Sequence, residues 1–146
     1  MSLRELYQEI IIDHGKQPRN YGTLPDATHS HAGYNPLCGD KLKVYLIAHK
    51  SKLEDIRFEG CGCAISMASA SLMTEAVKGK DMAYFQQLFA DFHVLVTEGT
   101  TSEDTLGKLS ALGGVVDFPV RVKCATLAWH TLKAALQHDP CPASTE

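Results

Sequence analysis

Along the first half of the chain, the hydrophobic positions change from helical to alternating spacing. Apolar side chains recur every three or four positions at the start, and Ser2 and Glu5 form a capping box, which predicts an amphipathic helix ending near Gly15. Proline and glycine residues then predict an irregular loop over residues 16–28. Strands are predicted over residues 29–34, 41–48 and 53–58, and the last two are expected to pair as an antiparallel hairpin.

The second half of the chain has mainly helical spacing. The Gly-Cys repeat at residues 60–63 is expected to end the third strand. A helix is expected to begin at or just after Cys63 and to stop at Gly79. Asp81 and Ser102 are candidate N-caps of two further helices, whose aromatic and leucine stripes are expected to be core.

The last segments complete the predicted fold. Residues 115–123, interrupted by Pro119, are expected to be extended, and a final helix is expected from about residue 124 to residue 138. Two prolines in residues 139–146 predict a disordered tail. The pattern therefore predicts an α/β (α+β) fold with a single domain over residues 1–138, in which about five helices pack mainly on one face of a small antiparallel three-stranded sheet.

Composition narrows the classes of function. A chain of 146 residues with 45% hydrophobic residues fits one domain with a sizeable core. The net charge is −3 without a basic run, and no apolar stretch approaches the roughly 20 residues that span a bilayer, so neither nucleic acid nor membrane is an expected partner. The N-terminus has no signal pattern, and five cysteines, an odd number, favour reduced thiols, so a cytoplasmic location is expected.

The first candidate site is the turn NPLCGD at residues 35–40, in which a thiol and a carboxyl group are separated by one glycine. Pro36 biases Asn35 away from helix, and Gly39 lets the chain turn so that Cys38 and Asp40 can face one centre. A soft sulfur and a hard oxygen together suit a mixed metal site. The alternative is an ordinary turn with Cys38 in the core.

Cys63 and Cys124 are candidates to complete this site. Each is predicted to lie where an extended segment gives way to a helix, and the positive end of the helix dipole favours a thiolate there. Cys38, Asp40, Cys63 and Cys124 would supply three sulfurs and one oxygen to a four-coordinate metal. The spacing is not that of a zinc finger, since the ligands come from distant loops. The alternative is that two of these cysteines are simply buried.

Three motifs together resemble the IscU/SufU (NifU N-terminal-like) family of iron–sulfur cluster assembly proteins. They are NPLCGD at residues 35–40, GCAISMASAS at residues 62–71 and RVKCATLAW at residues 121–129. The resemblance extends over roughly residues 2–137. It is greater to the SufU branch, because the separation of Cys63 and Cys124 is longer than in IscU proteins. The LPPVK segment of IscU is also absent, and Lys123 stands where IscU proteins have histidine.

This resemblance implies that Cys38, Asp40, Cys63 and Cys124 bind Zn²⁺. It also implies that Cys38 is a sulfurtransferase-like acceptor of persulfide sulfur from a cysteine desulfurase of the SufS type, which is relayed to downstream apo-proteins or a scaffold. The alternative function is a scaffold, on which iron or a [2Fe–2S] cluster is assembled by the same side chains and then transferred. A purely structural zinc module is disfavoured by the exchangeable carboxylate ligand and the long loops.

Arg121 and Lys123 are candidate supporting charges. Both are expected on one side of the extended segment entering Cys124, where they would offset the negative charge of three thiolates and a carboxylate. The alternative is solvated surface charge. Cys61 is interpreted as a small residue at a tight bend, although a spare acceptor or disulfide partner is also possible. The remaining residues with metal-binding side chains are expected to have no role in the site: Cys141 in the tail, His14, His29 and His31.

Overall fold

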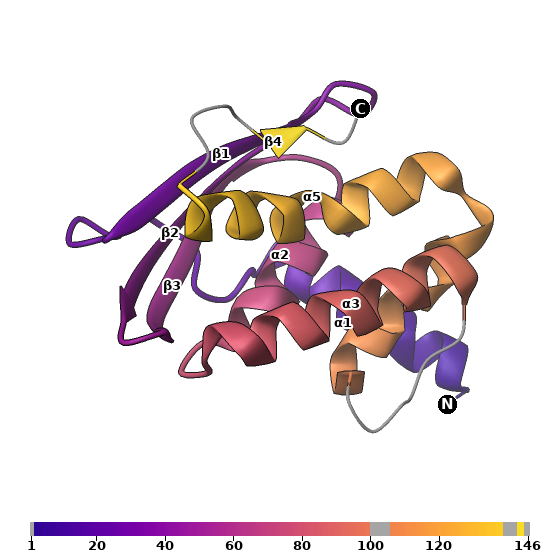
Figure 1. Ribbon diagram of the computed structural model, residues 1–146. Coiled ribbons are helices and arrows are strands. Elements are labelled where there is room, and N and C mark those ends of the chain that lie inside the picture. The colour runs from indigo at the N-terminus through magenta and orange to yellow at the C-terminus, as the bar shows by residue number, and fades with distance from the viewer. Residues whose placement is uncertain (1, 100–105, 139–142, 145–146) are drawn as a thin grey trace.

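A four-stranded sheet in the order β3-β2-β1-β4 forms one side of the molecule (Figure 1). The computed structural model describes residues 2–99, 106–138 and 143–144. The three predicted strands are confirmed, each slightly longer than expected, and they pair antiparallel. A two-residue fourth strand runs parallel to β1, so the sheet is mixed. The strands are β1 (His29–Asn35), β2 (Asp40–His49), β3 (Lys52–Cys61) and β4 (Ala143–Ser144).

β4 belongs to the segment that was predicted to be a disordered tail. The rest of that segment, which includes Cys141, lies outside the described residues. The sequence gives no cue for β4, because two residues are too few for a hydrophobic period to be read.

Helices cover one face of the sheet in two layers (Figure 1). Two helices contact the sheet directly, α2 through β3 and α5 through β1 and β2, and the other helices pack against these two. In the described part of the chain, no helix has the length and apolar character needed to cross a membrane. The helices are α1 (Leu3–Lys16), α2 (Ala64–Val77), α3 (Met82–Glu98), the 3₁₀ helix η1 (Gly107–Asp117) and α5 (Pro119–Leu136).

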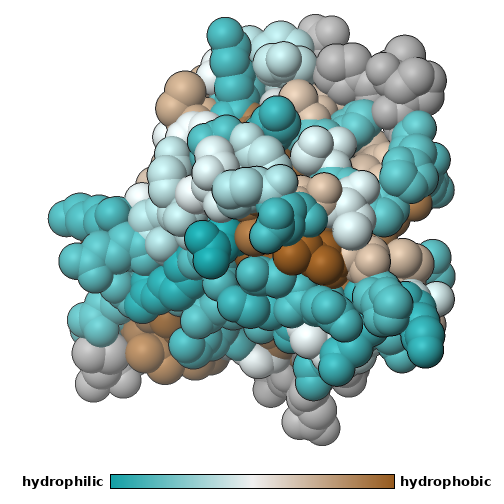
Figure 2. Space-filling view, turned by 90° about the vertical axis from the view of Figure 1, so that its left-hand side faces the viewer, coloured by the Kyte–Doolittle hydropathy of each residue, from teal (hydrophilic) through white to brown (hydrophobic). Residues whose placement is uncertain are grey.

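Alternation along β2 explains why only one face of the sheet is covered. Leu42, Val44 and Leu46 are buried against the helices, whereas Lys41 and Lys43 between them are exposed. The side of the molecule on which β2 and β3 lie in Figure 1 is accordingly largely hydrophilic (Figure 2).

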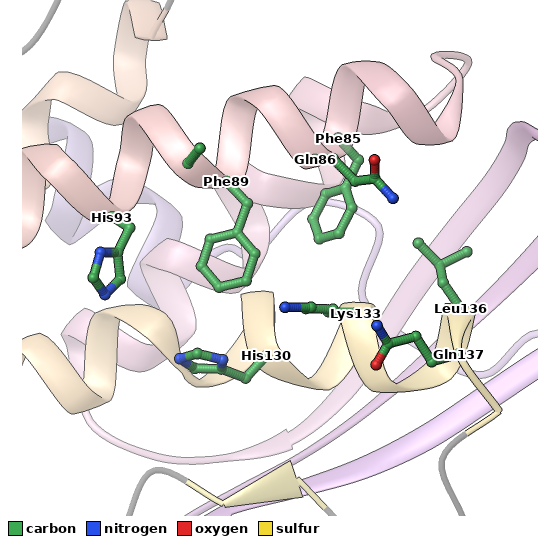
Figure 3. Close-up of a pocket in the computed structure, with 9 residues that line it drawn as sticks. Phe85, Gln86, Phe89, His93, His130, Lys133, Leu136 and Gln137 are labelled. Atoms are coloured by element: carbon green, nitrogen blue, oxygen red, sulfur yellow. The ribbon is translucent and has the colours of Figure 1, made fainter.

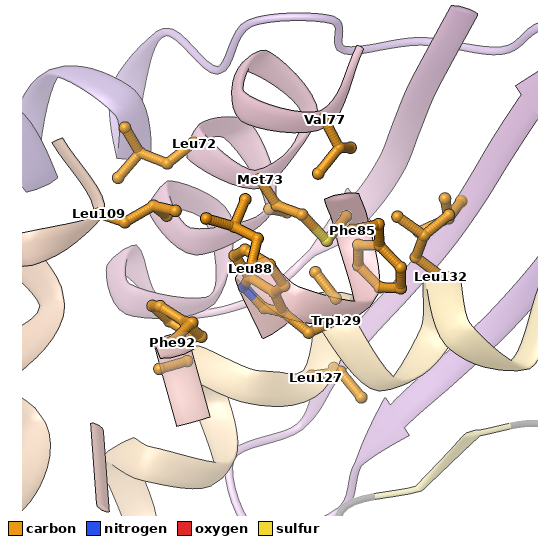
Figure 4. Close-up of a cluster of buried hydrophobic side chains, with 14 of the residues drawn as sticks. Leu72, Met73, Val77, Phe85, Leu88, Phe92, Leu109, Leu127, Trp129 and Leu132 are labelled. Atoms are coloured by element: carbon orange, nitrogen blue, oxygen red, sulfur yellow. The ribbon is translucent and has the colours of Figure 1, made fainter. Parts of the chain in front are cut away.

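The core is centred on Trp129 of α5, which is fully buried (Figure 4). Its ring stacks on Phe92 of α3, with the ring centroids 4.5 Å apart. Its indole N–H donates to the hydroxyl of Ser69 on α2 at 3.1 Å, so the polar atom of this large side chain has a partner. Small side chains along α2 are buried, and this helix packs against α5.

Three predicted helix ends are confirmed in detail. The Ser2 hydroxyl accepts the Glu5 N–H at 3.2 Å, and the Asp81 carboxylate accepts the Tyr84 N–H at 2.7 Å. Gly79 follows the C-cap of α2 with a φ of 80°, a left-handed conformation that glycine adopts without strain.

The predictions around Pro119 are wrong. Residues 115–117 belong to η1, and α5 begins at Pro119 rather than near Cys124. Proline is favoured at the first position of a helix, where its missing N–H would have no partner in any case. The predicted N-cap Ser102 lies outside the described residues, while Leu109 and Leu112 of the same predicted helix are buried in η1 as expected.

The prediction that residues 60–63 end the third strand is also wrong for its first two residues. β3 continues through Gly60 and Cys61, which pair with Leu42 and Lys41 of β2. A Cβ atom at Gly60 would lie 2.0 Å from the Lys41 carbonyl oxygen, so glycine here allows a close approach of two backbones.

His14 at the end of α1 is a buried titratable group outside the candidate site. The Ser71 hydroxyl accepts the Arg19 N–H at 2.8 Å and also hydrogen bonds with His14 Nδ1 at 2.7 Å. The other ring nitrogen, Nε2, faces Glu75 at 3.6 Å. Burial, followed by repulsion from Arg19, lowers the pKa of His14 below its usual value.

We expect His14 to make the protein less stable in mild acid. The pKa of His14 is lower in the folded than in the unfolded protein, whose histidine pKa is about 6.5. Above that pH His14 does not lower the free energy of unfolding, and as the pH falls below it the free energy of unfolding decreases, because the unfolded chain binds the proton more readily. One such group contributes a slope of at most about 1.4 kcal/mol per pH unit. His14→Asn, which keeps a hydrogen-bonding side chain next to Ser71 but does not titrate, should lose less free energy of unfolding than the wild type between pH 7.5 and pH 5.5 in urea titrations. Equal losses in both proteins would contradict this assignment.

Candidate metal centre

Three of the four predicted ligands converge at one end of the sheet. Cys38 Sγ, an Asp40 carboxylate oxygen and Cys124 Sγ all lie within 4.8 Å of one another. The first two come from the β1–β2 turn and the start of β2, and Cys124 comes from the second turn of α5. Their proximity therefore depends on the packing of α5 against β1 and β2.

The β1–β2 turn presents Cys38 to solvent. Asn35 and Asp40 lie opposite each other at the ends of the two strands, and the Asn35 carbonyl accepts the Cys38 N–H at 3.3 Å. Gly39 has a φ of 71°, so the turn uses the conformational freedom expected from this glycine. The alternative in which Cys38 lies in the core is wrong, because Cys38 is exposed.

Asp40 is only 1% exposed, and each of its carboxylate oxygens has a donor. Oδ1 accepts the Cys63 N–H at 2.9 Å, and Oδ2 accepts from Asn35 Nδ2 at 3.1 Å. Gly62 makes room for this carboxylate, since a Cβ atom there would lie 2.6 Å from Oδ1. The carboxylate is thus held between the β1–β2 turn and the start of α2.

Cys63 is the N-cap of α2, which confirms its predicted place at the start of a helix. Its sulfur accepts the Ser66 N–H at 3.4 Å and so occupies the position of a capping oxygen. It lies outside the group of three within 4.8 Å, but it is close enough to Cys124 to contribute to the raised pKa of that thiol. Cys63 therefore borders the cluster as its fourth member.

Cys124 is fully buried. Its thiol donates to Cys38 Sγ at 3.2 Å. Burial, and then hydrogen bonds with Cys38, Asp40 and Cys63, raise the pKa of this thiol. The prediction that a helix N-terminus favours its thiolate is wrong, because α5 begins five residues earlier, at Pro119. A cation at the cluster would have to displace its proton.

The residues beside the cluster are placed differently from the predictions. Arg121 and Lys123 lie on helix α5, where residues two apart do not share a face, so the expectation that they lie on one side of an extended segment is wrong. Their role as supporting charges stays a prediction.

Cys61 is not at a tight bend, as was interpreted, but at the end of β3, where it pairs with the exposed Lys41. Its side chain is exposed on the face of the sheet opposite to Asp40. Cys61, unlike Cys63, therefore does not face the cluster.

The three residues within 4.8 Å, with Cys63 at their border, offer the types of donor that zinc binds, namely thiolate sulfur and carboxylate oxygen. One ligand is exposed and one is fully buried, so a metal here would be reachable from solvent on the Cys38 side. The sequence-based reasoning missed Asn35, which was interpreted only as a turn residue. The position of Asn35 could have indicated its role. A residue directly before such a turn lies opposite the residue directly after it, which here is Asp40.

A separate cavity of about 570 Å³ lies between α3 and α5 and contains none of the predicted ligands (Figure 3). Phe89 and His93 of α3 point toward α5, which carries His130 and Lys133 on the opposite wall (Figure 3). His93 and Lys133 are exposed, so this is an open groove rather than an enclosed site.

Comparison with known proteins agrees with this fold. A family model described as the NifU-like N terminal domain matches residues 6–140. The "Zinc-dependent sulfurtransferase SufU" of Bacillus subtilis (strain 168) is 43% identical over 137 residues, which cover 90% of each chain. The "Iron-sulfur cluster assembly scaffold protein IscU" of Streptococcus pyogenes serotype M1 is 40% identical over 136 residues, which cover 92% of this chain and 85% of that protein.

A solved structure gives the same result. The crystal structure of FiSufU from Fervidobacterium islandicum AW-1 is 32% identical with a TM-score of 0.84, covering 92% of this chain and 99% of the other. The chain belongs to the NifU-like N terminal domain family of iron–sulfur cluster assembly proteins. The resemblance to the IscU/SufU family and the predicted fold class are thereby confirmed.

We expect Gly62→Ala to damage the cluster without unfolding the protein. The new methyl group would displace the Asp40 carboxylate and with it the hydrogen bond to the Cys63 N–H. Zinc affinity measured by competition with a chromophoric chelator should fall about tenfold or more, as expected when a group that orients a ligand is lost. Gly114→Ala, where a Cβ atom meets nothing within 4 Å, is the matched control and should bind zinc like the wild type.

Proposed function

We propose that this protein accepts sulfur on Cys38 from a cysteine desulfurase and relays it for iron–sulfur cluster assembly. The observation that carries the proposal is the cluster in which an exposed thiol, Cys38, lies within 4.8 Å of the buried groups Asp40 and Cys124. The name of the Bacillus subtilis relative, a zinc-dependent sulfurtransferase, supports this choice, and the similarity to SufU proteins favours a desulfurase of the SufS type. Because reduced thiols are needed, we place the reaction in the cytoplasm.

Cys38, Asp40, Cys63 and Cys124 are the proposed zinc ligands. Their donor set fits the preference of zinc for thiolates with a carboxylate. When bound, zinc would keep the cysteine sulfurs deprotonated at neutral pH. Cys38 lies on the turn and is exposed, whereas Cys124 is fully buried. Cys38 is therefore the sulfur that a partner protein reaches, and Asp40, Cys63 and Cys124 hold the site together.

The sulfur transfer needs no oxidant. The Cys38 thiolate attacks the outer sulfur of the desulfurase persulfide, and a new S–S bond forms as the bond between the two persulfide sulfurs breaks. The desulfurase cysteine leaves as a thiolate, and Cys38 carries the persulfide. Downstream apo-proteins or a scaffold then receive this sulfur by the same exchange.

Cys38→Ser should abolish the stimulation of a SufS-type desulfurase by this protein. The hydroxyl that replaces the sulfur is neither a thiolate nor an acceptor of sulfane sulfur. The measurement is alanine production from cysteine with and without the protein, together with mass spectrometry for an added sulfur. Cys61→Ser, at another exposed cysteine on the outer face of the sheet, is the control and should stimulate like the wild type. Full stimulation by Cys38→Ser would refute the proposal.

Scaffolding is the second candidate, since several relatives are named as IscU scaffold proteins. Here an iron–sulfur cluster is cargo, built on the same four side chains and passed on. The metal content and visible spectrum of the purified protein separate the two functions. About one zinc per chain without visible absorbance supports sulfur relay, whereas iron with visible absorbance and transfer to an apo-protein supports the scaffold.

A further inference from the structure

Asn35 contacts three of the four proposed ligand residues without being a ligand itself. Its backbone carbonyl accepts the Cys38 N–H at 3.3 Å. Its side-chain amide donates to Asp40 Oδ2 at 3.1 Å and to Cys124 Sγ at 3.4 Å. An amide group has two N–H bonds, and both are used here. The opposite orientation of the amide would set its oxygen against a carboxylate oxygen, so the partners determine which end is the donor.

We propose that Asn35 is a positioning residue of the metal centre, whose amide holds Asp40 and Cys124 in the orientation that binds zinc. This role rests on the proposed zinc site and adds a residue that supports it. Groups that hydrogen bond to metal ligands fix the ligand orientation, and their loss weakens metal affinity.

The position of Asn35 gives its side chain little freedom. It is the last residue of β1, directly opposite Asp40, and only 1% of it is exposed. Pro36 follows and restricts the Asn35 backbone to extended conformations. The amide is therefore enclosed between the turn and α5.

The burial of Asn35 is unfavourable apart from its contacts with the ligands. Its side-chain oxygen, Oδ1, is buried and has no hydrogen-bond partner among the described residues. A buried polar atom without a partner lowers stability. Such an unfavourable side chain is typical of functional sites, and this one donates to two of the proposed ligands.

Asn35 also completes the restraint on Asp40. One carboxylate oxygen accepts from Asn35 and the other from the Cys63 N–H, so the group is held at both ends. Without the amide, the carboxylate keeps one of these contacts and can rotate, and the Cys124 sulfur loses the same donor. One substitution should therefore loosen two ligands.

The test is Asn35→Leu in the full chain, with zinc as the probe. Leucine has the same branched shape but no donor, and it removes the unpartnered oxygen. We expect zinc affinity, measured by chelator competition, to fall about 10–100-fold, while the melting temperature of the zinc-free protein stays equal or rises. A purely structural asparagine would lower the melting temperature instead.

Asn20→Ala is the matched control. It removes an amide hydrogen bond of 3.1 Å to Thr74 and puts alanine at a φ of 57°, away from the cluster. It should lower the melting temperature and leave zinc affinity within about twofold of the wild type, because it touches no ligand. If Asn35→Leu does not fold, Asn35→Ser, whose hydroxyl is too short to reach both partners, takes its place.

Two outcomes would overturn the role of Asn35. One is wild-type zinc affinity in Asn35→Leu, and the other is an equal loss of affinity in Asn35→Leu and Asn20→Ala. Failure of the wild-type protein to bind zinc would refute the proposed zinc site itself and is seen before any variant is made.

Discussion

A carboxyl group that is removed from water has to be hydrogen bonded inside the protein, and Asp40 meets this requirement across two distant segments. It accepts from the β1–β2 turn through Asn35 and from the start of α2 through the Cys63 N–H. The turn and the helix are therefore held at a fixed separation. The cluster of cysteines is arranged around this carboxylate, with Cys38 and Cys63 on the two segments that it joins.

The third segment of the cluster, α5, is held by close packing together with hydrogen bonds. α5 lies so close to β1 that a Cβ atom at Gly33 would be 2.0 Å from the Thr131 hydroxyl. On its other side, Trp129 anchors the helix to α2 and α3. The sulfur of Cys124 is thus positioned by a helix that is clamped between the sheet and the outer helices, and the core contributes directly to the geometry of the site.

The sequence predicted most of the fold because local signals were consistent. Capping residues such as Ser2 and Asp81 and the alternation in β2 agree with the structure, since each depends on neighbours in the chain. Pro119 was misinterpreted because proline breaks a helix from within but also begins one, and only the packing of α5 decides between the two.

The candidate site was predictable to a similar extent. The thiol and carboxyl groups that meet at the candidate site could be selected from the chain and from its family resemblance. The burial of Cys124 and the contacts of Asn35 instead depend on α5 reaching the β1–β2 turn. Such contacts join residues far apart in the sequence, and the periodicity of hydrophobic residues does not predict them.

At the end of β3, side chains alternate between the two faces of the sheet, and this alternation has a chemical consequence. A persulfide that meets a second thiol is consumed, because the thiol forms a disulfide and the outer sulfur departs as hydrosulfide. Cys61 precedes Cys63 by two residues, yet its side chain lies on the solvent face of the sheet, opposite to Asp40. In the proposed relay, the sheet would keep the Cys61 thiol away from a persulfide on Cys38, so Cys61 would not consume the sulfur before a recipient arrives.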